Sequence, residues 1–134
     1  LGKAHGRTMF QDFNLGGAGW TDWNILLDER GGPNHVENFC FAPIHGDTRT
    51  GALIYTNSYY YIGHFSKFIR PGAKRIVVAP RPSMLLATGF VHPDGKVAVV
   101  VMNSTARGAQ YHLRVGTAEV VVRTPAHSIQ TVVY

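Results

Sequence analysis

A single cysteine at position 40 excludes an internal disulfide bond in this chain of 134 residues. No run of 18 or more apolar residues occurs, so the sequence predicts no transmembrane helix. The first residues lack the charged and then apolar order of a signal peptide, which leaves the compartment open. Only 16% of the residues are charged and 45% are hydrophobic, a balance that excludes an intrinsically disordered chain.

Negatively charged residues are also scarce, since the sequence has 13 Lys and Arg residues but only eight Asp and Glu residues. The densest basic cluster comprises Lys67, Arg70, Lys74 and Arg75, around the end of an expected helix. A helix dipole favours cations there, and anionic lipid head groups are the alternative explanation. No aromatic and basic stripe accompanies the charge, so we expect no nucleic-acid partner. The seven histidines never reach the close spacing of a zinc site, so we expect no metal.

The second half of the chain consists of short β-branched runs separated by turn residues. We expect strands at Arg75–Ala79, Leu85–His92, Lys96–Met102, Ala109–Val115, Ala118–Arg123 and Ser128–Tyr134. The sequence His92-Pro93-Asp94-Gly95 predicts a hairpin turn, since Asp-Gly tolerates a positive φ. Val97–Val101 is almost continuously apolar and is therefore expected in the centre of a sheet. Strands at intervals of about ten residues predict an antiparallel β-sandwich.

The first half has a different pattern. Residues 4–15 predict a helix that Gly16-Gly17 ends. We expect a strand at Ala18–Ile25 and a loop at Leu26–Asn38, which is rich in Gly, Pro and Asp. The boundary between these two sequence patterns falls near residues 70–74.

A second helix is expected between Asn57 and Ile69. Its apolar stripe would comprise Tyr59, Ile62, Phe65 and Ile69, and Asn57 or Ser58 would cap its beginning. Pro71-Gly72 would end it.

Two indoles lie on either side of a carboxylate at the end of the expected strand, as Trp20, Asp22 and Trp23. Alternation along a strand would direct Trp20 and Asp22 to one face and Trp23 to the other. Indole rings stack on the apolar face of a sugar, and polar neighbours bind its hydroxyl groups. The segment therefore suits a sugar site, and burial of both indoles in a core is the alternative.

A wider stretch carries a family resemblance. Gly19–Phe39, followed by Pro43-Ile44 and by Tyr61–Ile69, resembles the C-terminal part of glycoside hydrolase family 30, which includes the glucosylceramidases. The resemblance implies a mainly β fold, in which the last strand and helix of a (β/α)8 barrel precede an antiparallel β-sandwich. We therefore expect a barrel remnant at residues 1–72 and a sandwich domain at residues 73–134, in a fragment of a longer enzyme.

In this family two glutamates on earlier barrel strands hydrolyse an O-glycosyl bond with retention, without a metal or organic cofactor. Retention requires two carboxyl groups about 5–5.5 Å apart. Glu29, Glu37 and Glu119 are the only glutamates here, and none matches the family's catalytic motif. We therefore assign no catalytic residue, and expect the fragment to be inactive and the intact enzyme to act on a β-glucoside or glycolipid.

The resemblance also implies substrate-binding residues. Trp23 matches the indole that borders the glucosyl pocket, and Asn38 matches a polar residue near its mouth. Asp22 and Trp20 match the end of the strand beneath the pocket. The alternatives are a core role for Trp23, a loop-bracing amide for Asn38 and a buried hydrogen-bond partner for Asp22. His35 replaces an aromatic residue of some relatives, which leaves the contacts to the aglycone open.

Two other functions stay open. A non-catalytic carbohydrate-binding or scaffolding β-sandwich would use exposed aromatics such as Tyr111 or Tyr134. An interaction fragment would use unpaired strand edges and bare apolar faces to form a homo-oligomer, or to bind the missing barrel portion of its parent chain.

Overall fold

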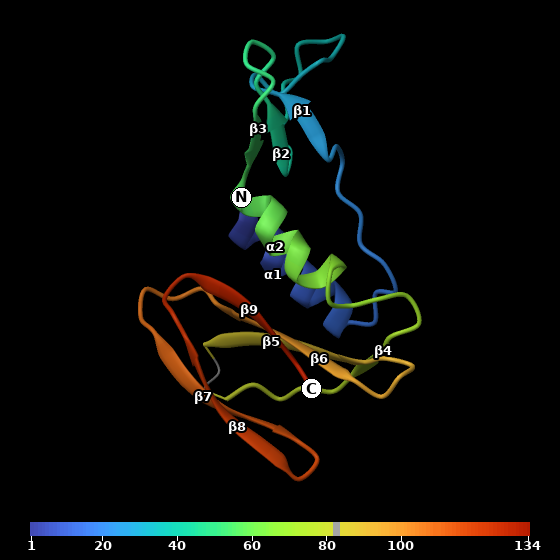
Figure 1. The fold of residues 1–134 in the computed structure, drawn as a ribbon, viewed down its shortest axis with the longest axis vertical. Coiled ribbons are helices and arrows are strands. Elements are labelled where there is room, and N and C mark those ends of the chain that lie inside the picture. Colours follow the sequence, from blue (N-terminus) through green and yellow to red (C-terminus); the bar gives the residue numbers. More distant parts are fainter. Residues whose placement is uncertain (82–83) are drawn as a thin grey trace.

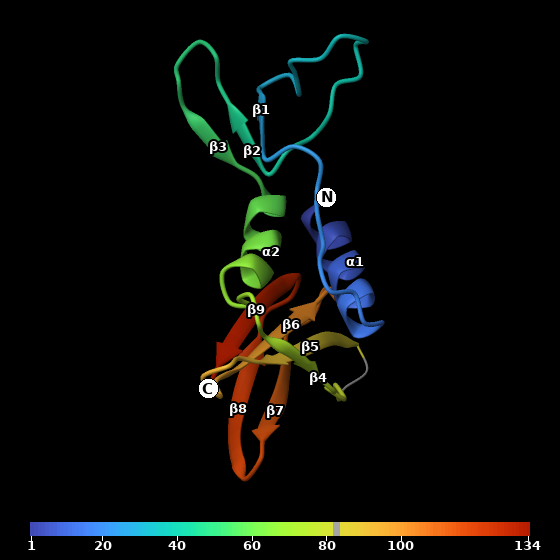
Figure 2. The ribbon, with the colours of Figure 1, turned by 90° about the vertical axis from the view of Figure 1, so that its right-hand side faces the viewer.

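The structure is a computed structural model that describes residues 1–81 and 84–134. Four layers follow one another along the molecule's long axis (Figures 1 and 2). A small three-stranded sheet lies at one end and is followed by two helices. A four-stranded sheet comes next, and a two-stranded hairpin forms the other end. The four-stranded sheet thus has helices on one face and the hairpin on the other.

The elements of the described residues are numbered along the chain. The helices are α1 (Gly2–Asn14) and α2 (Asn57–Ser66). The strands are β1 (Leu26–Asp28), β2 (Ile44–Gly46), β3 (Leu53–Tyr55), β4 (Lys74–Ile76), β5 (Leu85–Val91), β6 (Val97–Asn103), β7 (Ala109–Val115), β8 (Ala118–Thr124) and β9 (Ser128–Val133). The three sheets have the strand orders β1-β2-β3, β4-β5-β6-β9 and β7-β8.

The six strands expected in the second half are all present, and all their pairings are antiparallel. Five of the six agree closely with the expected bounds. The first is shorter, because β4 ends at Ile76 while the expected strand continued to Ala79. The hairpin turn at residues 92–95 is confirmed: Gly95 has a φ of 85°, and the amide of His92 donates to the carbonyl of Lys96 over 2.8 Å.

Strand β6 is central, as its continuous apolar sequence predicts. It pairs with β5 on one side and β9 on the other. Alternation divides its side chains between two cores. Val100 and Met102 pack against the helices, whereas Val99 and Val101 pack against the β7–β8 hairpin. Both faces are buried, which explains why apolar residues follow one another without interruption.

The sandwich core closes where β7 faces the four-stranded sheet. Tyr111 and Leu113 are buried there, while His112 and Arg114 between them are exposed. The expectation that Tyr111 is an exposed aromatic is therefore wrong, since its ring is only 7% exposed and its hydroxyl accepts a hydrogen bond from Gln130. Its sequence pattern fits burial, because every second residue of a one-sided strand points inward.

Both expected helices are present. Met9 and Phe10 of α1 pack against Tyr61 and Phe65 of α2. The stripe on α2 was predicted with Tyr59, which is 40% exposed, whereas Tyr61 occupies the core position. Thr56 precedes the first turn as the N-cap, in place of Asn57 or Ser58. Helix α2 also ends three residues earlier than expected.

The predicted strand at Ala18–Ile25 is wrong. This segment is extended, but among the described residues it joins no sheet, and pairing begins only at Leu26. A strand requires a ladder partner, and both edges of β2 are already occupied, by β1 and by β3. The expected loop from Leu26 therefore begins with a strand. Strand β3 was not predicted, because three exposed apolar residues show no alternation.

Candidate functional site

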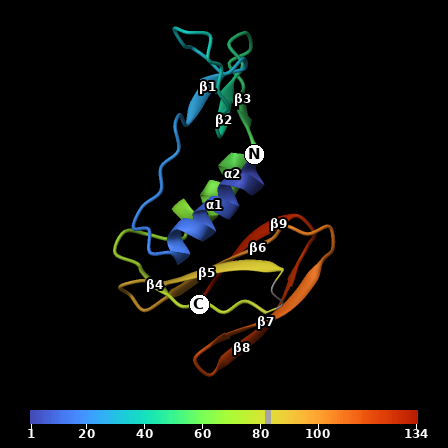
Figure 3. The ribbon, with the colours of Figure 1, turned by 180° about the vertical axis from the view of Figure 1, so that it is seen from behind.

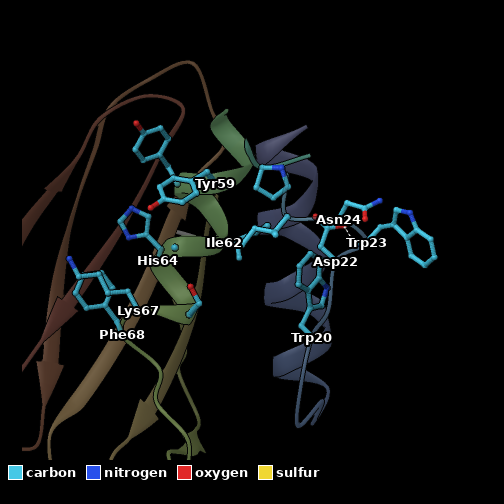
Figure 4. Close-up of a pocket in the computed structure, with 14 residues that line it drawn as sticks. Trp20, Asp22, Trp23, Asn24, Tyr59, Ile62, His64, Lys67 and Phe68 are labelled. Atoms are coloured by element: carbon cyan, nitrogen blue, oxygen red, sulfur yellow. Dashed lines mark hydrogen bonds between the residues drawn. The ribbon is translucent and has the colours of Figure 1, made fainter. Parts of the chain in front are cut away.

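A groove of about 610 Å³ lies between the extended segment 20–25 and helix α2 (Figure 4). We call it the α2 groove. Trp20, Asp22, Trp23 and Asn24 line one side, and aromatic and polar side chains of α2 line the other. The structure therefore brings three of the four predicted substrate-binding residues together beside one opening.

Asp22 and Trp20 both contact His5 of helix α1. The Nε2 atom of His5 lies 3.7 Å from a carboxylate oxygen of Asp22. The His5 and Trp20 rings meet edge to face, with centroids 5.8 Å apart. Trp20 also packs against the helix core. These contacts hold the segment around Trp20 and Asp22 against α1, although in the described residues this segment belongs to no sheet.

Trp23 points the other way. Figure 4 shows its ring directed away from α2, and the side chain is 83% exposed. Its backbone amide donates to the carboxylate of Asp22 over 2.9 Å. The core alternative for Trp23 is therefore wrong. The opposite orientations of Trp20 and Trp23 are those that strand alternation predicts, even though the segment is unpaired.

Asn38 lies apart from this group. It is exposed in the loop between β1 and β2 and is absent from the lining of the α2 groove. Its carbonyl accepts a contact from the thiol of Cys40 at 3.4 Å. That loop extends beyond the three-stranded sheet, away from the helices (Figure 3), so this structure separates Asn38 from the indoles.

Asp28 organises the same loop, and the sequence analysis did not single it out. One of its carboxylate oxygens accepts hydrogen bonds from the amides of Arg30 and Gly32, each over 2.8 Å. Gly31 has a φ of 88°, and a Cβ there would collide with the carbonyl of Cys40. An aspartate three residues before a Gly-Gly pair is the signal that could have indicated this turn.

The second side of the groove was also not predicted. It is lined by Tyr60 and His64 of α2 and by Lys67 and Phe68, which directly follow the helix. Of the three consecutive tyrosines at residues 59–61, Tyr61 alone is buried, and burial raises the pKa of its hydroxyl. Reading the helix periodicity from the polar residues would have found this face.

His64 connects the groove to the sandwich. Its Nδ1 lies 2.9 Å from the hydroxyl of Thr131 on β9, and that hydroxyl donates to the carbonyl of His64 over 3.3 Å. Burial between helix and sheet lowers the pKa of the His64 imidazole. The neutral ring is therefore favoured, and it stacks on Phe68 with centroids 6.2 Å apart.

The carboxylates of the chain do not form a catalytic pair at this groove. Asp22 is the only acidic residue that lines it within residues 1–81 and 84–134. Glu29 instead accepts hydrogen bonds from the amide and hydroxyl of Thr48, which lowers its pKa. Glu119 is bound to His112 and Arg114 on the hairpin. The groove thus offers stacking surfaces and hydrogen-bonding groups, whereas bond cleavage requires a second carboxyl group.

Within the described part of the chain, no group of three or more His, Cys, Asp or Glu side chains is placed to hold a metal ion. Over the same residues, neither helix combines the length and the apolar character needed to cross a membrane.

Comparison with protein families matches both halves of the chain. Residues 2–69 match the model of the glycosyl hydrolase family 30 TIM-barrel domain. Residues 72–132 match the model of the glycosyl hydrolase family 30 beta sandwich domain. The two models together cover nearly the whole sequence.

Curated relatives agree. The lysosomal acid glucosylceramidase of Mus musculus is 38% identical over 117 residues, which cover 84% of this chain and 22% of that protein. A relative from Caenorhabditis elegans is 31% identical over 136 residues, with 98% of this chain and 26% of that protein covered. The chain therefore spans about a quarter or less of the length of these relatives.

Solved structures share the fold. SrfJ from Salmonella typhimurium superposes with a TM-score of 0.94 at 34% identity, over 98% of this chain and 29% of that one. An endo-beta1,6-glucanase superposes with a TM-score of 0.75 at 25% identity, over 81% of this chain and 25% of that one. Barrel and sandwich models, sequence identity and superposition agree, and the chain belongs to glycosyl hydrolase family 30.

Proposed function

We propose that this chain belongs to a retaining β-glycosidase that hydrolyses the O-glycosyl bond of a β-glucoside or glycolipid. It contributes one part of the sugar pocket and the β-sandwich of that enzyme. The 134 residues alone are inactive in this proposal. The observation that carries it is an exposed indole, Trp23, next to the carboxylate of Asp22, at a groove that no second acidic residue of the described chain lines.

Each named residue has a role in the proposal. Trp23 stacks on the apolar face of the sugar, and Trp20 holds the segment against α1 from below. Asp22 accepts hydrogen bonds from sugar hydroxyl groups, and Asn38 contributes an amide once its loop approaches the pocket. The acid/base and the nucleophile come from a part of the enzyme outside these residues, since retention needs a close pair of carboxyl groups.

The partner in this proposal is the rest of the barrel. Apolar side chains on the small sheet are half exposed, among them Leu26, Leu53, Ile54 and Tyr55. Tyr60 on α2 is 57% exposed beside the groove. A monomeric soluble protein rarely leaves so many neighbouring apolar groups in water. Barrel elements that pack on these side chains would bury this apolar surface. In the isolated 134-residue chain, self-association is the competing way to bury it.

We also propose that residues 1–72 and 73–134 are two structural units of the enzyme. Support comes from the two family models, which meet between residues 69 and 72. The units share a core, because Val100 and Met102 of β6 pack against α1 and α2.

Hydrolysis of an aryl β-glucoside tests the proposed function. The 134-residue chain is expected to give no turnover above buffer, and the protein purified at its native length is expected to hydrolyse the substrate. Turnover by the 134 residues alone that disappears in Glu29→Gln or Glu37→Gln would overturn the proposal, as would a native-length protein without glycosidase activity.

The role of Trp23 has a matched control in the same segment. In the native-length enzyme, Trp23→Ala is expected to lower kcat/KM by about 10- to 100-fold, since it removes a stacking surface worth about 1–3 kcal/mol. Thr21→Ala, at an exposed side chain that does not line the groove, is expected to change kcat/KM less than twofold. Equal effects of the two variants would contradict a sugar contact at Trp23.

No observation favours the non-catalytic glycan-binding alternative. Of its two candidate aromatics, Tyr111 is buried in the sandwich core. Tyr134 is 36% exposed, and its hydroxyl is 3.5 Å from the carbonyl of Leu113. A flat, exposed aromatic platform on the sandwich would be needed for that function.

A further inference from the structure

The two ring nitrogens of His5, on helix α1, have different surroundings. Its Nε2 lies 3.7 Å from a carboxylate oxygen of Asp22. Its Nδ1 is buried and has no hydrogen-bond partner among residues 1–81 and 84–134. Burial of a polar atom without a partner lowers stability. A phenylalanine would pack on the edge of Trp20 without that loss, so packing alone does not account for an imidazole at this position.

The packing of α1 fixes the place of His5. Met9 and Phe13 follow it at intervals of four residues, so the three side chains lie along one face of the helix. Met9 is buried in the helix core, and Phe13 packs against that core. A Cβ at Gly2 would lie 2.9 Å from the carbonyl of Asn57, which shows how closely α1 approaches α2. Helix α1 is therefore a firm support from which the imidazole reaches the extended segment.

Asp22 connects this support to Trp23. One carboxylate oxygen of Asp22 faces His5, and the other accepts a hydrogen bond from the backbone amide of Trp23 over 2.9 Å (Figure 4). Residues 20–24 belong to no sheet in the described part of the chain, so no strand ladder there fixes the backbone at Trp23. The two contacts of Asp22 therefore link the direction of the Trp23 indole to helix α1.

His5 acts on a ligand through other residues. Its side chain is only 21% exposed and does not line the α2 groove. The distance between Nε2 and the carboxylate of Asp22 exceeds a hydrogen bond, so the attraction between them is electrostatic. In the neutral ring this attraction favours the tautomer with its hydrogen on Nε2, which leaves the buried Nδ1 without one. The polar contribution of His5 therefore comes from Nε2.

We propose that His5 is a positioning residue of the sugar pocket. Its Nε2 orients the carboxylate of Asp22, and this carboxylate holds the backbone of Trp23 so that the indole faces the sugar. A stacking surface works only when its supporting residues keep it in place, and here that support comes from a helix. The inference rests on the proposed function, in which Trp23 stacks on a sugar ring.

Two amide side chains separate the roles of the two nitrogens. The amide nitrogen of glutamine can take the place of Nε2, and that of asparagine the place of Nδ1. In the native-length enzyme with an aryl β-glucoside, His5→Gln is expected to keep kcat/KM within about twofold. His5→Asn should lower kcat/KM by about 5- to 10-fold, mainly through a higher KM, since stacking already acts on the bound substrate. His5→Phe, which keeps a ring against Trp20 but has no nitrogen, should resemble His5→Asn.

A double-mutant cycle tests whether His5 acts through Asp22. Asp22→Asn removes the charge that Nε2 attracts, so His5→Phe has nothing further to disrupt in that background. We expect the double variant to lose no more than about twofold in kcat/KM beyond Asp22→Asn alone. A double variant that shows the full product of the two single losses overturns the proposal.

The outcomes distinguish this proposal from the proposed function. A native-length enzyme without glycosidase activity overturns both. An active enzyme in which His5→Gln and His5→Asn lose kcat/KM equally overturns the role of His5 alone. Thermal denaturation of the three His5 variants adds a further check. A kcat/KM that falls in step with the Tm across them would show that His5 only stabilises the fold, which also overturns the proposal.

Discussion

At the scale of single side chains, Asn103 forms four hydrogen bonds that connect separate segments of the chain. It is fully buried at the end of β6. Its amide nitrogen donates to the carbonyls of Arg107 and Pro125, over 2.8 and 3.0 Å. Its amide oxygen accepts from the backbone and the hydroxyl of Thr105. Asn103-Ser104-Thr105 also fits the N-glycosylation pattern, but an amide nitrogen with two carbonyl partners in the interior is inaccessible to a glycan.

Asn103→Ala is expected to lower the free energy of unfolding by about 3 kcal/mol, because it removes four hydrogen bonds made by a fully buried amide side chain. The neighbouring Ser104→Ala removes a hydroxyl for which the structure shows no hydrogen bond, and should change that free energy by less than about 0.5 kcal/mol. Urea denaturation of both variants measures the difference. Similar stability of the two would contradict the network.

Among the elements, the two helices meet at a residue without a side chain. A Cβ at Gly6 would lie 2.8 Å from Cδ1 of Tyr61 and 2.9 Å from Sδ of Met102. Gly6 therefore lets α1 approach both α2 and the four-stranded sheet. Gly63, in α2, has nothing within 4 Å of the position its Cβ would take.

These two glycines predict opposite responses to the same change. Gly6→Ala should destabilise the protein by about 1–2 kcal/mol, because overpacking outweighs the better helix propensity of alanine. Gly63→Ala should stabilise it by about 0.5–1 kcal/mol, since only propensity acts there. Thermal denaturation distinguishes the two, and stabilisation by both variants would show that α1 is not tightly packed.

At the scale of the whole molecule, one sheet connects both halves of the chain. Val100 and Met102 face the helices of the first half, and Val99 and Val101 face the hairpin of the second. Asn14 adds a link, since its amide donates to the carbonyl of Ala87 on β5 over 3.0 Å. Loss of packing on one face of β6 therefore affects both halves.

We expect the chain to unfold in one transition. Trp20 and Trp23 report on the first half by fluorescence, and far-UV circular dichroism reports largely on the strands of the second half. Met102→Ala should shift both signals together, with a loss of about 2–5 kcal/mol. Separate midpoints for the two signals would show that the halves are independent folding units.

Prediction from the sequence succeeded where short-range patterns decide structure. The strands of the second half alternate apolar and polar residues or lie between turn residues, and each pattern is local. It failed at Ala18–Ile25, where the residues favour a strand but no partner is available. The apolar stripe of α2 was predicted with Tyr59 in place of Tyr61 for a similar reason. The helix periodicity is compatible with either residue, and only packing against α1 selects Tyr61.

The candidate site shows the same division. The indoles and Asp22 were found from residue type and spacing, and their opposite orientations follow from alternation. The α2 side of the groove and the bonds of Asp28 were not found, although local patterns indicate both: the polar periodicity along α2, and an aspartate shortly before a Gly-Gly pair. Asn38 lies away from the groove because its loop packs on Asp28 and Cys40 and not on the helices.

The sequence by itself determined the family, the order of most elements and the absence of a matching pair of catalytic glutamates, because motifs and periodicity are properties of neighbouring residues. Only the tertiary structure decided which tyrosine is buried, that Trp23 is exposed, and that within residues 1–81 and 84–134 β7 pairs with β8 alone. Those outcomes depend on which distant segments come into contact, since burial and strand pairing are completed only between elements of the folded chain.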